Sequence, residues 1–214
     1  MTEDVSYWLE FGKVALAHAI AVVSPGPDFA VVLRQSIGYG RRTGCWTSAG
    51  IATAILLHVS YSLLGIGFVV RQSDVAFEIL RWMGAGYLGW LGVQALRAKP
   101  TSSTPVVGEP NRRIPTRWSA FATGFFTNAL NPKAALFFVG LFLSVISVST
   151  PKLIQAAYGL WMVAGTFAWF SALTIWVTRP AFVRRLTEYG HWISRLLGVV
   201  LLALAASLVL SREK

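Results

Sequence analysis

The chain has few charged residues and almost no cysteine for its length. Of its 214 residues, 19 are Lys or Arg and 9 are Asp or Glu. The charged share of 13% is about half of that in an ordinary soluble domain. A single cysteine, Cys45, excludes an intramolecular disulfide and any Cys-x-x-Cys redox or zinc site, and we expect it to be a packing residue. With 55% hydrophobic residues and a mean hydropathy of +0.57, the composition indicates a polytopic α-helical membrane protein.

The basic residues lie mainly in the short connections between long apolar runs. The net charge is +10, which in a soluble protein raises the question of nucleic acid binding. Here the position of the positive charge favours contact with a lipid bilayer, and we expect no nucleic acid partner. The N-terminus carries Glu3, Asp4 and Glu10 before Lys13, whereas a cleaved signal peptide has a positive n-region. We therefore expect the first apolar segment to be retained.

Six apolar windows are long enough to cross a bilayer as helices, which takes roughly 20 residues. They cover about 14–33, 46–70, 79–96, 118–150 and 153–177, with a sixth that ends near residue 210. The connections after the first, third and fifth windows are rich in arginine, and those after the second and fourth are neutral or carry one lysine. Because cytoplasmic loops carry an excess of Lys and Arg, we expect the odd connections in the cytoplasm and both termini on the outer side of the membrane.

The windows divide into two groups of three. Residues 98–117 form the one extended polar stretch, rich in Pro, Ser and Thr, and we interpret it as a cytoplasmic linker, with a phosphorylation or docking role as the alternative. It joins a first three-helix repeat, 1–97, to a second, 118–214, within one membrane domain. An odd number of spans inverts the second repeat relative to the first. In the third window, Ala85-xxx-Gly89 predicts close helix packing.

The first window contains a sequence that a membrane helix tolerates poorly, Ser24-Pro25-Gly26-Pro27-Asp28. Each proline lacks a backbone N–H donor and clashes with the carbonyl four residues back, and glycine is unusually free in backbone conformation. A charge such as that of Asp28 costs about 2.5–3.5 kcal/mol at a helix centre on insertion scales. Irregular backbone at membrane depth is tolerated only where it is buried in protein or lines a watery cavity. We therefore predict a broken helix whose break lies at a transport cavity.

The fourth window is interrupted in the same way, by Asn-Ala-Leu-Asn-Pro-Lys at residues 128–133. When Pro27 is aligned with Pro132, Asp28 corresponds to Lys133. The first helix of each repeat is thus predicted to be broken. Paired interruptions at corresponding positions of two halves are the best sequence indication of a transporter binding site.

Asp28 and Lys133 are the two charges deepest within apolar windows. They can neutralise each other in the empty site, or divide a zwitterion between them, with the carboxylate facing an amino group and the ammonium a carboxylate. Pro132 leaves the carbonyl of Asn128 without its helical donor, and Asn131 is pushed out of helical geometry by the proline that follows it. We predict that both asparagines complete the site and that Asp28 exchanges a proton with the gradient.

More ordinary roles stay open for the same residues. Asp28 can serve only as the N-cap of the second half-helix, and Lys133 can be a structural partner of Asp28 or extend toward the membrane surface. The prolines can be packing kinks without ligand contact. His18 and His58, on apolar faces, are more often hydrogen-bonded core residues than proton relays, and their roles are left open.

Three stretches of the chain resemble a known family. They are the Pro-Gly-Pro-Asp segment with the Gly- and Arg-rich 38–44 that follows it, residues 84–97, and residues 124–134. Together they resemble blocks of the lysine exporter / homoserine–threonine resistance (LysE/RhtB) family, in order from about residue 14 to 142. The last third is similar to the family only in hydropathy. The resemblance implies a multi-pass exporter of amino acids or their derivatives in the bacterial inner membrane, driven by proton exchange, with the Pro-Gly-Pro-Asp and Asn-Pro-Lys positions as site residues.

The sequence therefore predicts an all-α polytopic membrane protein of about six transmembrane helices in two inverted repeats. We expect a secondary transporter and not an enzyme, with a small zwitterionic substrate, protons as the coupling ion, and no cofactor or metal. The alternatives are export of another metabolite or a metal ion, or a membrane-embedded enzyme. A metal carrier would need several His, Cys or carboxylate ligands in its spans, and for an enzyme His58 and Ser60 are the nearest pair. The exported compound, the stoichiometry and the oligomeric state, a homo-oligomer included, are left open.

Overall fold

The computed structural model of the chain describes residues 2–72, 74–99, 113–147, 149–177 and 180–210, and the regular structure of these residues is entirely helical. Most of the expected linker, 98–117, lies outside them. The eight helices in the described residues are α1 (Thr2–Val23), α2 (Pro27–Tyr39), α3 (Arg41–Gln72), α4 (Asp74–Leu96), α5 (Arg117–Ala129), α6 (Pro132–Val145), α7 (Lys152–Trp176) and α8 (Pro180–Leu210).

Two pairs of helices are each bent at a short break. α1 and α2 meet at 52°, and α5 and α6 meet at 57°. Pro27 and Pro132 each occupy the start of the second helix of a pair, where the missing N–H would be unpaired in any case. Both predicted breaks are thus confirmed, because each proline ends one helix and begins the next.

The helices that are long and apolar enough to cross a membrane are fewer than the six expected. Within the described residues, α3, α7 and α8 each contain such a segment, and the two bent pairs raise the number to five. α4 covers the third predicted window but is not among them. A polytopic helical membrane protein is therefore supported, and the sixth crossing is an expectation that the structure does not establish.

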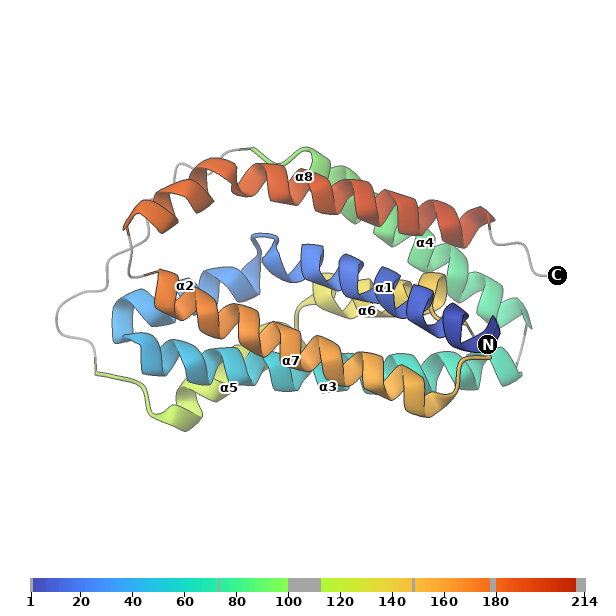
Figure 1. Ribbon diagram of the computed structural model, residues 1–214, viewed down its shortest axis with the longest axis horizontal. Coiled ribbons are helices and arrows are strands. Elements are labelled where there is room, and N and C mark those ends of the chain that lie inside the picture. Colours follow the sequence, from blue (N-terminus) through green and yellow to red (C-terminus); the bar gives the residue numbers. More distant parts are fainter. Residues whose placement is uncertain (1, 73, 100–112, 148, 178–179, 211–214) are drawn as a thin grey trace.

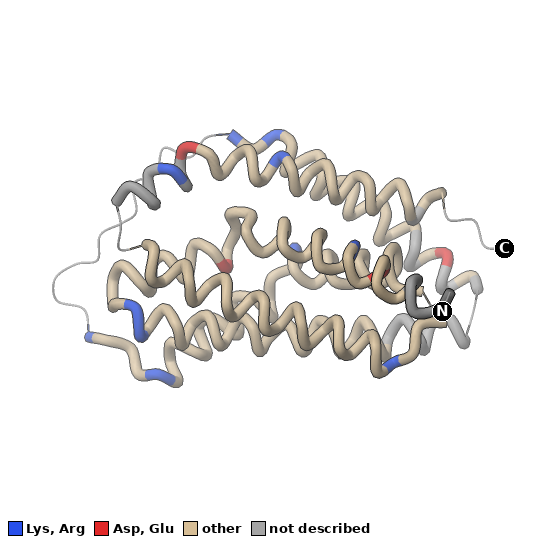
Figure 2. Tube along the Cα trace, viewed as in Figure 1, with Lys and Arg blue, Asp and Glu red and all other residues tan. Residues whose placement is uncertain are grey.

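The helices run roughly along one long axis (Figure 1). The start of α1 and the end of α8 lie at one end of this axis, together with the connection from α6 to α7, while the connection from α2 to α3 lies at the opposite end. Among the residues that Figure 2 colours, a group of Lys and Arg lies at that opposite end, where α3 and α5 begin. The two ends of the bundle therefore differ in charge.

Close packing between helices depends on glycine, although not at the position predicted. A Cβ atom on Gly50 of α3 would collide with the backbone at Phe121 of α5, and one on Gly124 would collide with the backbone at Thr47. Gly92 of α4 approaches α8 so closely that an added Cβ would lie 3.0 Å from the carbonyl of Gly198. An added Cβ on Gly89 would meet nothing within 4 Å, so the Ala85-xxx-Gly89 prediction was wrong in register.

Candidate functional site

A cavity of about 80 Å³ lies between the two helix breaks. It is lined by Ser24, Gly26, Pro27 and Asp28 of the first break, and by residues of the second. The second break contributes Asn128, Asn131 and Lys133. Apolar side chains such as Ile55, Phe138 and Leu201 form much of the remaining wall. Seven of the nine predicted site residues therefore meet around one space, although they come from parts of the chain about 100 residues apart.

The other two predicted residues, both prolines, have structural positions. Pro25 packs against α8, since a Cβ atom on Gly190 would lie 3.1 Å from its Cγ. Pro132 begins α6 and is exposed. Neither lines the cavity. Both prolines shape the breaks without facing a ligand there.

Asp28 binds across the cavity and does not cap its own helix. α2 begins at Pro27, its N-cap is Gly26, and no side chain caps it, so the N-cap alternative for Asp28 was wrong. The Asp28 Oδ2 atom accepts a hydrogen bond of 2.9 Å from the Asn128 Nδ2 atom. Its Oδ1 atom is buried and has no hydrogen-bond partner among the described residues. One carboxylate oxygen is thus held by the second break, and the other is available to a ligand or a proton.

The second break is held by its own asparagines. Asn131 is the N-cap of α6, and its Oδ1 atom accepts a hydrogen bond of 3.0 Å from the backbone N–H of Lys133. The carbonyl of Asn128, predicted to lack a donor, accepts one of 2.9 Å from the backbone N–H of Asn131. The polar groups that Pro132 leaves without helical partners are therefore partly satisfied within the break.

Lys133 faces the first break. A Cβ atom on Gly26 would lie 3.8 Å from its Nζ atom, which places the ammonium at the N-terminus of α2. No ion pair joins Lys133 and Asp28 among the described residues, although each lies within electrostatic range of the other. The two opposite charges thus lie on one cavity without neutralising each other by direct contact.

His58, whose role the sequence left open, contacts a residue of this site. It is 1% exposed. Its Nε2 atom lies 3.1 Å from the Asn128 Oδ1 atom and 3.2 Å from the Asn128 carbonyl oxygen. Its Nδ1 atom lies 2.6 Å from the hydroxyl of Tyr61. Ser60, which lies near His58 in sequence, is exposed on the same helix, and residues two apart on a helix do not face each other.

A second polar pair lines the cavity away from the charges. His18 of α1 is buried, and its Nε2 atom lies 3.0 Å from the hydroxyl of Thr166 on α7. The sequence indicated His18 as a buried residue but contained no signal for Thr166. This pair can bind a hydroxyl or another uncharged polar group in a wall that is otherwise apolar.

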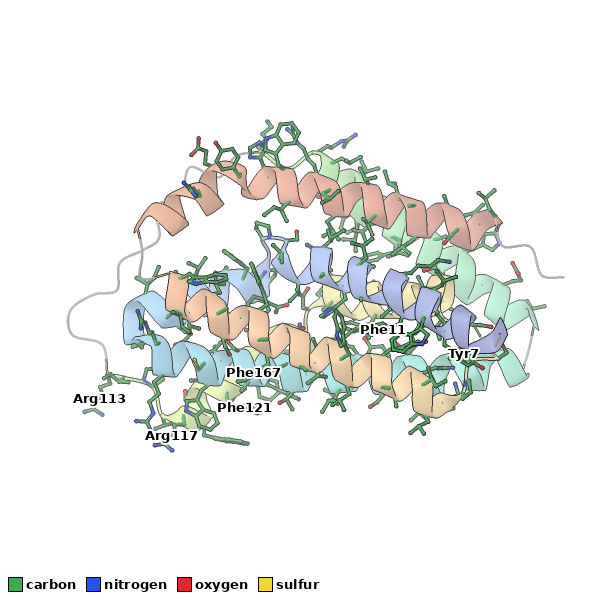
Figure 3. All side chains as sticks on the ribbon, in the orientation of Figure 1. Tyr7, Phe11, Arg113, Arg117, Phe121 and Phe167 are labelled. Atoms are coloured by element: carbon green, nitrogen blue, oxygen red, sulfur yellow. The ribbon has the colours of Figure 1, made fainter. Side chains whose placement is uncertain are left out.

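Glu10 is a further buried carboxylate, which the sequence placed only at the membrane boundary. It is 8% exposed and accepts hydrogen bonds of 3.0 Å from the backbone N–H of Ser147 and 3.0–3.1 Å from the hydroxyl of Thr150. It thereby ties α1 to the connection between α6 and α7. Its chain neighbours Tyr7 and Phe11 lie at the end of the bundle opposite Arg113 and Arg117 (Figure 3).

In the part of the chain that the structure describes, no three His, Cys, Asp or Glu side chains group in a way that could hold a metal ion. Cys45 packs beside α7, with its Sγ atom 3.4 Å from the hydroxyl of Thr174, as expected for a packing residue.

Comparison with known proteins places the chain among transporters. Residues 19–212 match the family described as LysE type translocator. The threonine efflux protein of Salmonella typhi is 26% identical over 94% of this chain and 98% of its own length. That of Escherichia coli K12 is 25% identical over the same shares. The homoserine/homoserine lactone efflux protein of Salmonella typhi is 32% identical over 65% of this chain and 66% of its own. No solved structure matches the chain.

Proposed function

Because the chain belongs to the family of LysE type translocators, which are transporters and not enzymes, we propose that it exports amino acids or their derivatives across the bacterial inner membrane by proton antiport. Relatives that match it over nearly their whole length are named for threonine efflux, and others for homoserine efflux. The substrate class is proposed on that similarity and on the chemistry of the cavity.

The observation that carries the proposal is the placement of Asp28 and Lys133 on one cavity. Each is the second residue of a half-helix that begins with proline, and both side chains line the space between the breaks. A zwitterionic amino acid presents one positive and one negative group to such a site. Its two charges match those of the cavity, which makes a zwitterion a better fit than a singly charged metabolite.

The carboxylate of the substrate is proposed to bind where Lys133 faces the start of α2. The first N–H groups of α2 have no side-chain cap, and an uncapped helix N-terminus favours an anion. The amino group is proposed to bind the free Oδ1 atom of Asp28. Asn131 is already engaged in capping α6, so in this arrangement it shapes the site and Lys133 supplies the charge.

Transport is proposed to follow alternating access around this cavity. Asp28 binds either a proton or the substrate amino group, so that release of one accompanies uptake of the other. We propose six spans in two inverted repeats, 1–97 and 118–214, with both termini in the periplasm. The start of α1 and the end of α8 lie at one end of the bundle (Figure 1), and a group of Lys and Arg residues lies at the other, where α3 and α5 begin (Figure 2). Both placements support this orientation.

The proposal is tested by efflux of labelled amino acids from preloaded cells or inside-out vesicles. Wild type should export one group of amino acids, and a protonophore should stop that export. Asp28→Asn should lose it while reaching the membrane in normal amount. Glu188→Gln, which removes an exposed carboxylate on α8, is the matched control and should export normally.

Normal export by Asp28→Asn would remove Asp28 from the mechanism, and export that persists with the protonophore would contradict proton coupling. No export of any amino acid from well-inserted wild type would favour another metabolite as the substrate. The double exchange Asp28→Lys with Lys133→Asp should not restore transport, since the charges would then face the wrong ends of the substrate. Restored transport would mean that the two charges act only as a structural pair.

A further inference from the structure

A chain of hydrogen-bonding groups leads from the cavity to the surface of α3. It begins at the Asp28 carboxylate and passes through the carboxamide of Asn128 to the imidazole of His58. From there it continues to the hydroxyl of Tyr61 and to the carbonyl oxygen of Ala135, 3.2 Å from that hydroxyl. Tyr61 is 40% exposed. The charged group proposed for transport is therefore linked to the outside of the bundle.

The direction of each hydrogen bond is determined when Asp28 is charged. The carboxylate can only accept, so the Nδ2 atom of Asn128 donates to it. The Oδ1 atom of Asn128 then faces His58 and accepts from the Nε2–H group. With its one proton on Nε2, the neutral imidazole presents a lone pair at Nδ1. Tyr61 has a single hydroxyl proton, which is donated to that lone pair and not to Ala135.

All directions reverse when Asp28 takes a proton on its Oδ2 atom, the oxygen that faces Asn128. The Asp28 hydroxyl group donates to the Oδ1 atom of Asn128, whose carboxamide has turned over. The Nδ2 atom of Asn128 now donates to Nε2 of His58, whose proton has moved to Nδ1 and is donated to the oxygen of Tyr61. The Tyr61 hydroxyl donates to the Ala135 carbonyl. The whole chain holds one proton more than before, and His58 is neutral in both arrangements.

We infer that His58 and Tyr61 are positioning residues that set the proton affinity of Asp28 through the carboxamide of Asn128. The inference rests on the proposed proton antiport and deepens it. Each arrangement satisfies one backbone oxygen that can only accept. That of Asn128 lies 3.2 Å from Nε2 of His58 and is bound when Asp28 is charged, and that of Ala135 lies 3.2 Å from the hydroxyl of Tyr61 and is bound when Asp28 is protonated. Uptake of a proton on the Oδ2 atom of Asp28, which faces Asn128, requires the chain to reverse, and Tyr61 forms its outer end.

Few other titratable groups face these residues. Lys133 of α6 and His18 of α1 line the same cavity as Asp28. The cavity lining from α7 and α8 in the described part of the chain is uncharged, namely Thr166, Phe170, Leu197 and Leu201. His58 is stacked on Phe138 of α6, with ring centroids 5.3 Å apart and planes at 8°. Lys133 and His18 keep their places in a variant of Tyr61, so a change of pH profile reports on the chain.

The direct test is the pH profile of Tyr61→Phe. Without the hydroxyl, the arrangement with charged Asp28 loses one hydrogen bond, while the protonated arrangement loses two, from Nδ1–H of His58 and to the carbonyl of Ala135. The protonated form loses more, so the midpoint of export against pH should move to lower pH. One hydrogen bond corresponds to a shift of about one pH unit, or roughly tenfold in proton affinity. Tyr189→Phe, on an exposed tyrosine of α8, should keep the wild-type midpoint.

A second measurement does not require transport. The infrared band of a protonated carboxyl group, assigned to Asp28 by its loss in Asp28→Asn, should titrate at lower pH in purified Tyr61→Phe. His58→Phe keeps the aromatic stacking on Phe138 but removes both ring nitrogens. In that background, Tyr61→Phe should cause no further shift, because the chain is already interrupted.

The outcomes of these experiments distinguish a failure of this inference from a failure of the proposed proton antiport. If wild-type export depends neither on pH nor on the protonophore, both the proton antiport and the role of His58 and Tyr61 are wrong. Proton-coupled wild-type export, with the same midpoint and the same infrared titration in Tyr61→Phe, would overturn the role of His58 and Tyr61 and leave the antiport standing. An equal shift by Tyr61→Phe with and without His58 would show that Tyr61 acts by another route.

Discussion

Asn128 donates a hydrogen bond of 2.9 Å to Asp28 across 100 residues of sequence. This contact joins the two helix breaks, because Asn128 ends the first half of one bent span and Asp28 begins the second half of the other. Asn128 is 3% exposed, and the donor and the acceptor of its carboxamide both bind groups inside the protein. A change at Asn128 should therefore affect both breaks together.

Replacement of Asn128 by Leu tests this contact between the two helix breaks. The leucine has nearly the same volume but leaves the Asp28 Oδ2 atom without its partner, while the His58 Nε2 atom keeps the backbone oxygen of residue 128. An unpaired buried charged group costs about 1–3 kcal/mol or more, which corresponds to roughly a tenfold loss of export. Efflux per molecule of membrane-inserted protein measures the effect. Export at the wild-type rate would show that the contact between the breaks is dispensable.

Lys133→Met should specifically weaken recognition of the substrate carboxylate. Methionine keeps the unbranched apolar stem but removes the ammonium that faces Gly26. A hydrogen bond to a charged group contributes about 1.5–3 kcal/mol, so the KM for amino acids should rise roughly tenfold or more. Competition by amino acid amides, which lack the carboxylate, should change little. If the binding of amino acids and of their amides weakens equally, Lys133 has a structural role and does not bind the carboxylate.

Thr166→Val should alter which side chains are accepted. Valine has the shape of threonine, but it removes the hydroxyl that lies 3.0 Å from His18 on the cavity wall. Export of hydroxyl-bearing amino acids should fall severalfold relative to aliphatic ones of similar size, as expected for the loss of one neutral hydrogen bond of about 1 kcal/mol. The ratio of efflux rates for such a pair is the measurement. An unchanged ratio would place the substrate side chain elsewhere in the cavity.

Gly124→Ala should destabilise the protein, because the added methyl group collides with the backbone of α3 at Thr47. The two helices must move apart along their contact, and overpacking typically costs about 1–3 kcal/mol. Thermal unfolding in detergent should occur at lower temperature than in wild type. Gly89→Ala, where an added Cβ meets nothing within 4 Å, is the matched control and should not lower it. Equal stability of both variants would contradict the close contact of α3 with α5.

Glu10→Gln should loosen the connection between α6 and α7. The carboxylate accepts hydrogen bonds from Ser147 and Thr150, and bonds to a charged acceptor contribute about 1.5–3 kcal/mol. Proteolysis or hydrogen exchange of residues 149–152 in the purified protein should become faster, with Glu188→Gln as the exposed control. Unchanged protection would mean that the neutral amide holds the connection equally well.

Local chemistry made much of this protein predictable. The class follows from composition, because long apolar runs with so few charges have no other stable arrangement. The breaks follow from Pro27 and Pro132, since the lack of an N–H donor acts on the nearest turn whatever surrounds it. The correspondence of Asp28 with Lys133 follows from their common position after those prolines. Each of these inferences depends on neighbours in sequence.

Contacts between helices depended on the folded bundle. Helix rotation decides which side chain meets which, and rotation results from packing over the whole length of a helix. For this reason the close helix contact predicted for Gly89 is made by Gly92. For the same reason Asp28 binds Asn128 of another helix, although its sequence position was also compatible with capping its own helix. The same dependence brings His58 to Asn128 and buries Glu10 against the connection between α6 and α7. The proline signals locate the site, but only the packing of α3 and α5 against the breaks determines its hydrogen bonds.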